Sequence, residues 1–262
     1  MDARDLLCYW SISCAGDQSA MMRAIRQKKE ATPEEVESNV RRIKSKWVTL
    51  LDDDYPDALK KMPMPPLVLF YRGDYSLISD YTRCVSIVGS REATSYALKK
   101  AEELARGAAD KGYSVISGLA KGVDTAVANG AFPYGRAVAV LGNGLGRVYP
   151  PENEALQRMI GQKGLLISEY PDDVGPAPYQ FPARNRIIAG LSKATILAEA
   201  KLHSGSMITC ALALELNRDV GAVPFRADED SACNVIIKEG AALIESVDDL
   251  LLLLEGSERF YK

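Results

Sequence analysis

Runs of consecutive apolar residues alternate with amphipathic stretches from residue 84 onward. The first run is Cys84–Val88, and between Ser95 and Lys111 the apolar positions recur on one face of a helix that Gly112 ends. Further runs of this kind are Tyr113–Ser117, Ala137–Leu141, Leu165–Ser168, Ala194–Ala198 and Val220–Val223. Strands that are apolar along their whole length have both faces covered. Their alternation with helices predicts a doubly wound, mostly parallel α/β sheet.

The residues before about 80 follow a different pattern. Short segments predict helices here. The turn Gly16–Ser19 starts one before Ala20, and Thr32–Glu35 starts another with proline at a first helical position. The proline-rich stretch Pro63–Pro66 cannot lie inside a helix or a central strand, and Leu67–Tyr71 predicts a short strand. We therefore expect a small helical domain, a connecting segment, the α/β domain and a tail. Their expected bounds are residues 1–57, 58–80, 81–255 and 256–262.

Composition is that of a soluble globular protein, with 47% hydrophobic and 26% charged residues. The net charge of −3 argues against a strongly basic nucleic-acid binder, so a nucleic-acid site would depend on local charge. The apolar runs are too short to cross a bilayer and the N-terminus lacks the layout of a signal peptide, so we expect a cytoplasmic protein without membrane contact. The five cysteines form no CxxC pair and the one histidine is His203, which predicts neither a disulfide scaffold nor a metal site.

Glycine-rich or polar turns follow several of the expected strands. In doubly wound sheets, ligands bind outside the carboxyl ends of the strands, where these turns would converge. Glycine lets the backbone approach a ligand closely, amides at helix starts attract anions, and arginine suits bidentate contact with phosphate. The pattern therefore predicts a phosphate-binding site. Its candidate residues are Gly89, Ser90, Arg91, Gly118, Lys121, Gly122, Gly142, Asn143, Gly144, Arg184, Asn185, Arg186, Ser204, Gly205 and Ser206.

The motifs of common nucleotide-binding and hydrolytic sites are missing. The turn after the first strand lacks G-x-G-x-x-G, and the second strand ends at Ser117-Gly118, where a dinucleotide-binding protein would carry an acid for the ribose. No Gly-Lys-Ser/Thr and no G-x-S-x-G occurs, which argues against a P-loop and against a serine hydrolase. We therefore expect no cofactor.

Longer motifs across these turns resemble, in the same order, those of the DNA-processing protein A family. They are Ser86–Arg91, Ser117–Asp124, Ala139–Gly144, Val148–Asn153, Phe181–Ser192 and Ser204–Ser206. The resemblance covers about residues 48–250. It implies an extended Rossmann-like domain that binds single-stranded DNA. It also implies that the protein delivers a RecA-type recombinase to this DNA in natural transformation and recombination.

The resemblance also assigns residues. Arg91 and Lys121 fall on family positions that contact DNA, and Arg184, Asn185 and Arg186 belong to the family's most regular motif. Four such cations, each neutralising one phosphate, would give a slope of log K against log salt of about −3. The family further implies a homodimer, although the side chains concerned are equally compatible with simple core packing. These are Val235, Ile236, Ile237, Leu243 and Ile244.

Aromatic residues near the basic turns could stack on bases, and the candidates are Tyr149, Tyr179 and Phe181. Many family members carry a C-terminal winged-helix domain, for which the residues after 255 leave no room, so we expect none here.

Two other classes of function stay open. Related Rossmann-like enzymes bind or hydrolyse nucleotides, and those that release cytokinin bases show a Pro-Gly-Gly-x-Gly-Thr loop with a glutamate three residues later. The corresponding turn here, His203–Ser206, lacks that glutamate, so we expect no catalytic residues and no enzyme. A pure scaffold that binds only a recombinase would have no affinity for DNA.

Overall fold

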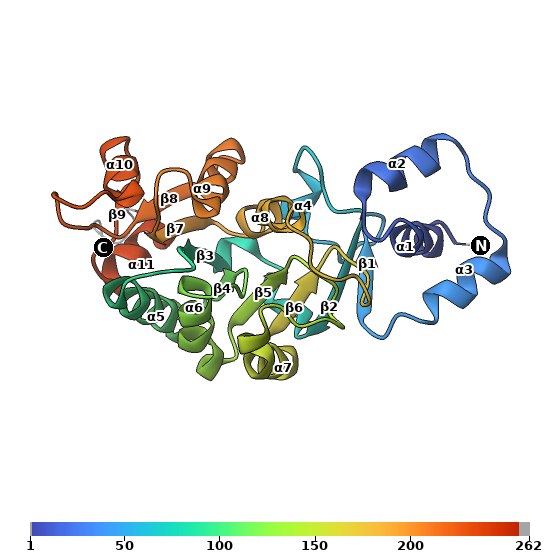
Figure 1. Cartoon of the computed structure of the whole chain (residues 1–262), viewed down its shortest axis with the longest axis horizontal. Coiled ribbons are helices and arrows are strands. Elements are labelled where there is room, and N and C mark those ends of the chain that lie inside the picture. Colours follow the sequence, from blue (N-terminus) through green and yellow to red (C-terminus); the bar gives the residue numbers. More distant parts are fainter. Residues whose placement is uncertain (1, 257–262) are drawn as a thin grey trace.

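The computed structural model describes residues 2–256 and is built around one nine-stranded sheet (Figure 1). The strand order is β1-β2-β6-β5-β4-β3-β7-β8-β9. Strands β3 to β9 are mutually parallel, whereas β1 and β2 are antiparallel to their neighbours. The strands are β1 (Lys46–Thr49), β2 (Val68–Gly73), β3 (Cys84–Gly89), β4 (Ser114–Ser117), β5 (Ala137–Leu141), β6 (Leu165–Ser168), β7 (Ala194–Glu199), β8 (Asp219–Ala222) and β9 (Ala242–Leu243). The expected mostly parallel sheet is confirmed.

Helices cover both faces of this sheet (Figure 1). One face carries α5 (Ser95–Asp110), α6 (Val123–Ala131), α7 (Glu154–Lys163) and α11 (Val247–Glu255). The other carries α4 (Asp57–Lys60), α8 (Gln180–Gly190), α9 (Gly205–Glu215) and α10 (Ala232–Lys238). Short 3₁₀ turns are η1 (Tyr75–Ile78), η2 (Tyr81–Arg83), η3 (Phe132–Tyr134) and η4 (Pro151–Asn153). Along β3, Val85 and Ile87 enter the first core while Cys84 and Val88 enter the second, so the doubly wound architecture is confirmed.

The chain reverses its direction of travel across the sheet at β3. From β3 it proceeds through β4 and β5 to β6, toward one edge, and from β7 through β8 to β9 at the other edge. The helix after β3 lies on one face and the helix after β7 on the opposite face. A crevice therefore opens between the carboxyl ends of these two adjacent strands, at the topological switch point.

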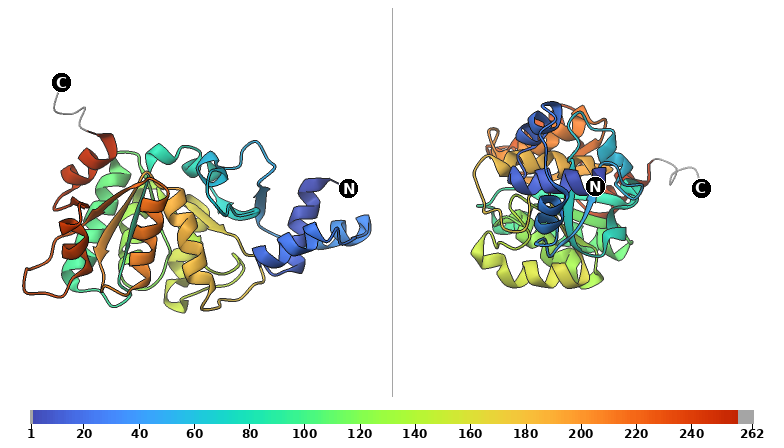
Figure 2. Two further views of the ribbon diagram at one scale, coloured as in Figure 1. Left: turned by 90° about the horizontal axis from the view of Figure 1, so that it is seen from above. Right: turned by 90° about the vertical axis from the view of Figure 1, so that its right-hand side faces the viewer.

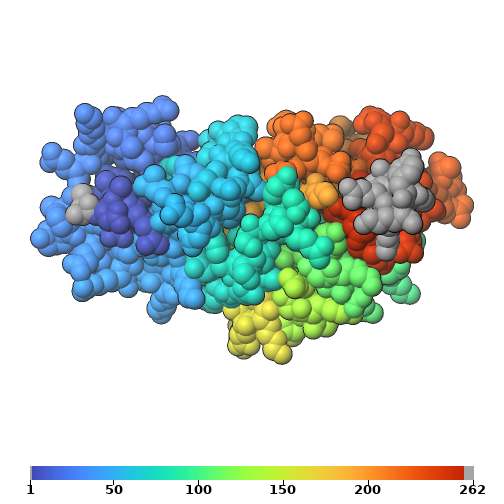
Figure 3. Space-filling view, turned by 180° about the vertical axis from the view of Figure 1, so that it is seen from behind, coloured from blue at the N-terminus to red at the C-terminus, as the bar shows by residue number. Residues whose placement is uncertain are grey.

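Three helices, α1 (Ala3–Ser13), α2 (Gln18–Arg26) and α3 (Pro33–Val40), project beyond β1 at one end of an elongated molecule (Figure 2). The C-terminal elements lie at the other end (Figure 3). The two expected helix starts are confirmed, since Asp17 caps α2 through the Ala20 amide and Thr32 forms a capping box with Glu35.

The domain boundaries stay predictions, but the sheet crosses two of them. Strand β1 lies within the expected helical domain and β2 within the expected connection, yet both pair in the central sheet. The sequence pattern does not predict a strand at Lys46–Thr49, because only its last two residues are buried and it has no apolar run. Most of the expected tail, from residue 257, lies outside the described residues. Over residues 2–256 there is no helix long and apolar enough to span a membrane.

Candidate anion-binding site

A pocket of about 500 Å³ opens at the switch point, beside the carboxyl ends of β3 and β7. Three segments far apart in the sequence wall it: the turn after β3, the first half of α8 and the start of α9. The candidates that line it are Gly89, Ser90, Arg91, Arg184, Asn185, Ser204, Gly205 and Ser206. The expected convergence of these turns is therefore seen, while their role in binding stays a prediction.

Backbone contacts fix the turn after β3. The amide of Ser90 donates to the Glu199 carbonyl at 2.8 Å, and the Ser206 hydroxyl donates to the Gly89 carbonyl at 2.8 Å. A Cβ atom at Gly89 would lie 2.5 Å from Val123 Cγ2, so only glycine allows this approach. The pocket wall is thus held by β7, α6 and α9 together.

The start of α9 faces the pocket with unused donors. Ser204 is the N-cap residue, but its side chain makes no capping hydrogen bond. Its buried Oγ atom has no hydrogen-bond partner among residues 2–256. A Cβ at Gly205 would meet nothing within 4 Å, so the backbone is open to a ligand here. Free amides at the start of a helix favour an anion.

Arg184 lies at the floor of the pocket with a side chain that is only partly satisfied. The residue is 4% exposed, and its Nη1 donates to the Val140 carbonyl. Its Nε atom has no hydrogen-bond partner within the described part of the chain. Burial lowers the pKa of Arg184 to about 10, against the opposing effect of Asp124. A buried guanidinium with an unused donor suits a negatively charged ligand.

Asp124 is the buried counterpart of Arg184 and was not among the sequence candidates. Its Oδ2 accepts from the amides of Gly118 and Ala120 at 3.1 and 3.2 Å. Burial raises the pKa of Asp124, while Arg184 and the two amides oppose the shift. The only signal in the sequence was its place in the motif Gly118–Asp124, because an acid in the first turn of a helix is usually a cap.

An aromatic pair and Arg91 form the outer rim. The Tyr149 and Phe181 rings lie 5.2 Å apart, and the Arg91 guanidinium lies 5.4 Å from the Phe181 ring. Arg91 itself is exposed. Two of the three aromatic candidates therefore reach the pocket, whereas Tyr179 does not line it and is 69% exposed.

Three other candidates, Lys121, Gly118 and Gly122, lie next to the pocket without lining it. Lys121 pairs with Glu152 at 2.5 Å on the surface, one residue beyond Ala120, which lines the pocket. At Gly118, the Arg184 guanidinium occupies the space of a Cβ. Gly122, with φ of +75°, lies under the Ser90 carbonyl.

The turn Gly142–Gly144 is a tight turn that does not line the pocket. The buried Asn143 amide donates within the turn, to the carbonyls of Gly144 and Arg147. Phe181 covers Gly142, and Gly144 lies against the Pro171 carbonyl. The turn therefore supports the rim from below.

Arg186 also differs from expectation, since it points away from the pocket and pairs with Glu169 at 2.6 Å. Helix periodicity explains this, because Arg184 and Ile188 share one face of α8 and Arg186 lies on the other.

The five residues expected at a dimer interface divide between core and surface. Ile236 and Ile244 are buried in the two cores of this chain. Val235 and Ile237 are half-buried. Leu243 is 45% exposed on the edge strand β9. The homodimer stays a prediction, and Leu243 is the residue best placed for it.

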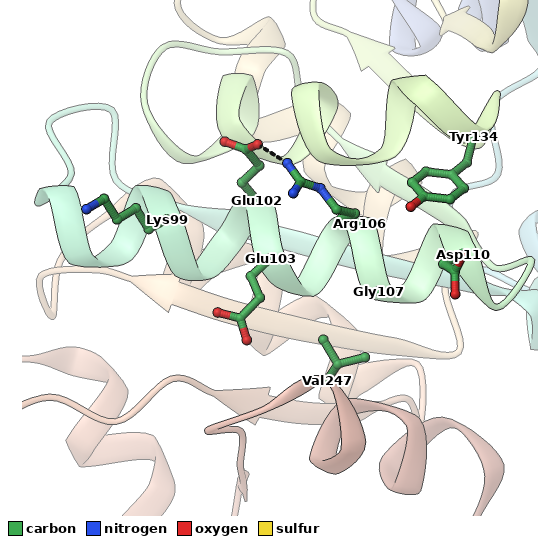
Figure 4. A pocket seen from close by; sticks show the side chains of 8 residues that line it. All are labelled: Lys99, Glu102, Glu103, Arg106, Gly107, Asp110, Tyr134 and Val247. Carbon is green, nitrogen blue, oxygen red and sulfur yellow. Dashed lines mark hydrogen bonds and ion pairs between the residues drawn. The ribbon is translucent and has the colours of Figure 1, made fainter.

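A separate groove of about 550 Å³ lies between α5, η3 and the start of α11 (Figure 4). Arg106 pairs there with Glu102 at 2.5 Å. The other charged residues along it are Lys99, Glu103 and Asp110. Because acids outnumber bases, this groove does not suit a polyanion.

The fold and the pocket define a Rossmann-like α/β protein with a candidate anion-binding crevice at the switch point of its sheet. The family model for DNA recombination-mediator protein A matches residues 46–255, and the chain belongs to this family. The resemblance found in the motifs is thereby confirmed.

Relatives and solved structures agree with this assignment. DNA processing protein DprA of Streptococcus pneumoniae is 41% identical over 210 residues, which cover 79% of this chain and 73% of the relative. Protein Smf of Synechocystis is 40% identical over 213 residues, which cover 79% of this chain but only 54% of Smf. The X-ray structure of the Streptococcus pneumoniae protein superposes with a TM-score of 0.78 at 33% identity, covering 96% of this chain and 98% of that one. DNA processing protein A of Helicobacter pylori, whose structure concerns its single-stranded DNA binding mode, gives 0.74 at 31% identity, covering 81% and 97%.

Proposed function

We propose that this protein binds single-stranded DNA in the crevice between β3 and β7 and holds it mainly by its phosphates. The observation that carries the proposal concerns two buried donors, the Nε of Arg184 and the Ser204 hydroxyl at the start of α9. Neither has a hydrogen-bond partner among residues 2–256. Family membership and the DNA-binding relative from Helicobacter pylori support it.

The rim gives each part of a strand a distinct contact. A phosphate at the start of α9 meets amides and the Ser204 hydroxyl, and the exposed Arg91 neutralises it or its neighbour. The Tyr149–Phe181 pair offers ring faces on which any base can stack. Because phosphate contacts carry no base information, sequence preference is weak.

The biological role in this proposal is that of a recombination mediator. The protein, as a homodimer in the cytoplasm, brings a RecA-type recombinase to single-stranded DNA during natural transformation and recombination. It acts by binding and does not catalyse a reaction. Family membership supports this role.

Binding of a labelled single strand and of the matching duplex, measured by fluorescence anisotropy over a salt series, tests the proposal. Arg91 and Arg184 line the pocket and Lys121 lies at its edge, whereas Arg186 is engaged elsewhere. The expected slope of log K against log salt is therefore roughly −1.4 to −2.1 per protomer, about −0.7 for each of two or three phosphates. Absence of binding at low salt, or equal affinity for duplex, contradicts it.

Arg91→Ala should weaken binding of the single strand about tenfold and make the salt slope shallower by about 0.7, because one phosphate contact is lost. Arg106→Ala is the matched control, since it removes an arginine from the groove of Figure 4. Equal losses in the two variants would mean that general charge, rather than the pocket, drives binding.

A mononucleotide is a second candidate ligand, because a pocket of about 500 Å³ is large enough for one and Asp124 lines it. Hydrolysis is not expected, since the Asp124 carboxylate is already held by two backbone amides. Release of base or phosphate from a nucleoside monophosphate by the purified protein would establish the enzymatic alternative.

A further inference from the structure

The Arg186 side chain joins α8 to three other parts of the molecule. Its Nη2 contacts Glu169 Oε1 at 2.6 Å and donates to Gln18 Oε1, in α2, at 3.1 Å. Its Nε donates to the Met64 carbonyl at 3.2 Å. Its Nη1 closes back on the Ala183 carbonyl of its own helix at 3.0 Å. Every nitrogen of the guanidinium is thus occupied away from the pocket.

This junction is largely withdrawn from water. The side chains of Arg186 and Glu169 are 15% and 8% exposed. Gln18 completes the junction by donating its Nε2 to the Pro65 carbonyl at 2.6 Å. A buried ion pair of this kind tolerates little displacement, because separation leaves a charge unpaired in a poorly hydrated site.

The turn between α1 and α2 and the loop after α3 make two more contacts with the segment between β6 and α8. The turn between α1 and α2 lies on Tyr170, where a Cβ at Gly16 would come within 2.6 Å of the ring. Asp172 accepts from the amides of Lys44 and Ser45, at 2.8 and 3.0 Å, and from the Ser45 hydroxyl. The N-terminal helices and the loop that follows them therefore hold both the segment that leads into α8 and α8 itself.

The opposite face of α8 forms part of the pocket. Phe181, Arg184 and Asn185 project into it, and Asn185 also donates to the Gly205 carbonyl at 3.2 Å. A shift or rotation of α8 would move all three side chains relative to α9. The position of this helix consequently sets the spacing between the two sides of the crevice.

We propose that Arg186 is a positioning residue, through which the N-terminal helices fix α8 and so hold the pocket in its binding geometry. The inference rests on the proposed binding of single-stranded DNA. It predicts that Gln18 contributes to DNA affinity, although Gln18 does not line the pocket. It also removes Arg186 from the set of phosphate contacts.

Gln18→Ala and Arg186→Lys test this in the full-length protein, with a labelled single strand as the probe. Gln18→Ala breaks only the link to α2 and Pro65, and Arg186→Lys keeps the charge but loses the fork of donors. Each should weaken binding about three- to tenfold, a range typical of residues that act through a network. The salt slope should equal that of the unmodified protein, because no phosphate contact is lost. Combined, the two substitutions should weaken binding by less than the product of their separate effects.

Gln27→Ala is the matched control, since Gln27 is an exposed glutamine at the end of α2 and should leave affinity unchanged. Thermal unfolding of each variant shows whether it is folded. If Arg186→Lys does not fold, the affinity of Gln18→Ala alone tests the inference. Normal affinity in a folded Gln18→Ala variant overturns the inference, and so does a shallower salt slope in Arg186→Lys. If the unmodified protein fails to bind DNA, the proposed function itself fails, which is a distinguishable result.

Discussion

At the scale of single residues, the pocket contains side chains that can be predicted from the sequence and one that cannot. Arg91 and Arg184 could be predicted, because arginines beside Gly-Ser and Phe-Pro turns are unusual as plain surface charges. Asp124 could not, since its role depends on the fold bringing Arg184 next to it across 60 positions of the chain. Proximity in sequence places Arg186 with Arg184 in one predicted site, although the two side chains lie on opposite faces of α8.

Asp124→Asn should lower the free energy of unfolding by about 3 kcal/mol, because it leaves the buried Arg184 without its opposite charge. Urea unfolding at neutral pH measures this from the shift in midpoint at unchanged slope. Asp53→Asn is the control, since Asp53 is exposed and should change the midpoint little. A stable Asp124→Asn variant would show that the carboxylate does not hold the pocket floor.

At the scale of elements, apolar runs predicted the central strands closely. The expected strands at 137–141 and 165–168 coincide with β5 and β6. The expected helix from Ser95 to Lys111 matches α5 to within one residue. Strands β1 and β9 could not be found this way, because β1 is half exposed and β9 has two residues. The order of the strands could not be predicted either, because strand pairing depends on contacts between residues that are distant in sequence.

The turn after β5 gives a prediction about the rim. A Cβ at Gly142 would lie 2.8 Å from Phe181 Cδ1, so Gly142→Ala must displace the ring on which Arg91 rests. We expect single-strand affinity to fall about threefold and stability to fall by about 1 kcal/mol, as in mild overpacking.

Gly175→Ala is the control for this change, because a Cβ there meets nothing within 4 Å. Anisotropy titration and thermal unfolding of the two variants compare them. If Gly142→Ala binds DNA as well as Gly175→Ala does, the Phe181 ring has no part in the site.

At the scale of the whole molecule, an acidic chain presents a local basic crevice. The net charge of −3 is compatible with nucleic-acid binding only because Arg91 and Arg184 gather at one place. Composition alone therefore argues against the proposed ligand, and only the local arrangement of arginines supports it. The elongated shape places the N-terminal helices and the edge strand β9 at opposite ends (Figures 1 and 2).

The proposed homodimer can be tested at the β9 end. Leu243→Asp should convert a dimer into a monomer in sedimentation-velocity experiments, because a charge would be desolvated at the interface. Leu51→Asp is the control, since Leu51 is 59% exposed beside β1, at the other end of the sheet. A dimer that survives Leu243→Asp but not Leu51→Asp would place the interface at the opposite end.

The pairing of β2 with β6 has a consequence for the order in which the protein is made. Phe70 of β2 lies opposite Ser168 of β6, so β2 can pair with the parallel part of the sheet only after β6 has been synthesised. During synthesis the amino-terminal helices emerge before the sheet. Arg186, which bonds to α2, and Asp172, which binds the loop after α3, emerge only after strands β3 to β6 have been translated. Closing so long a loop is slow relative to local pairing. The amino-terminal helices, although synthesised before the sheet, are therefore among the last of the described elements to be assembled.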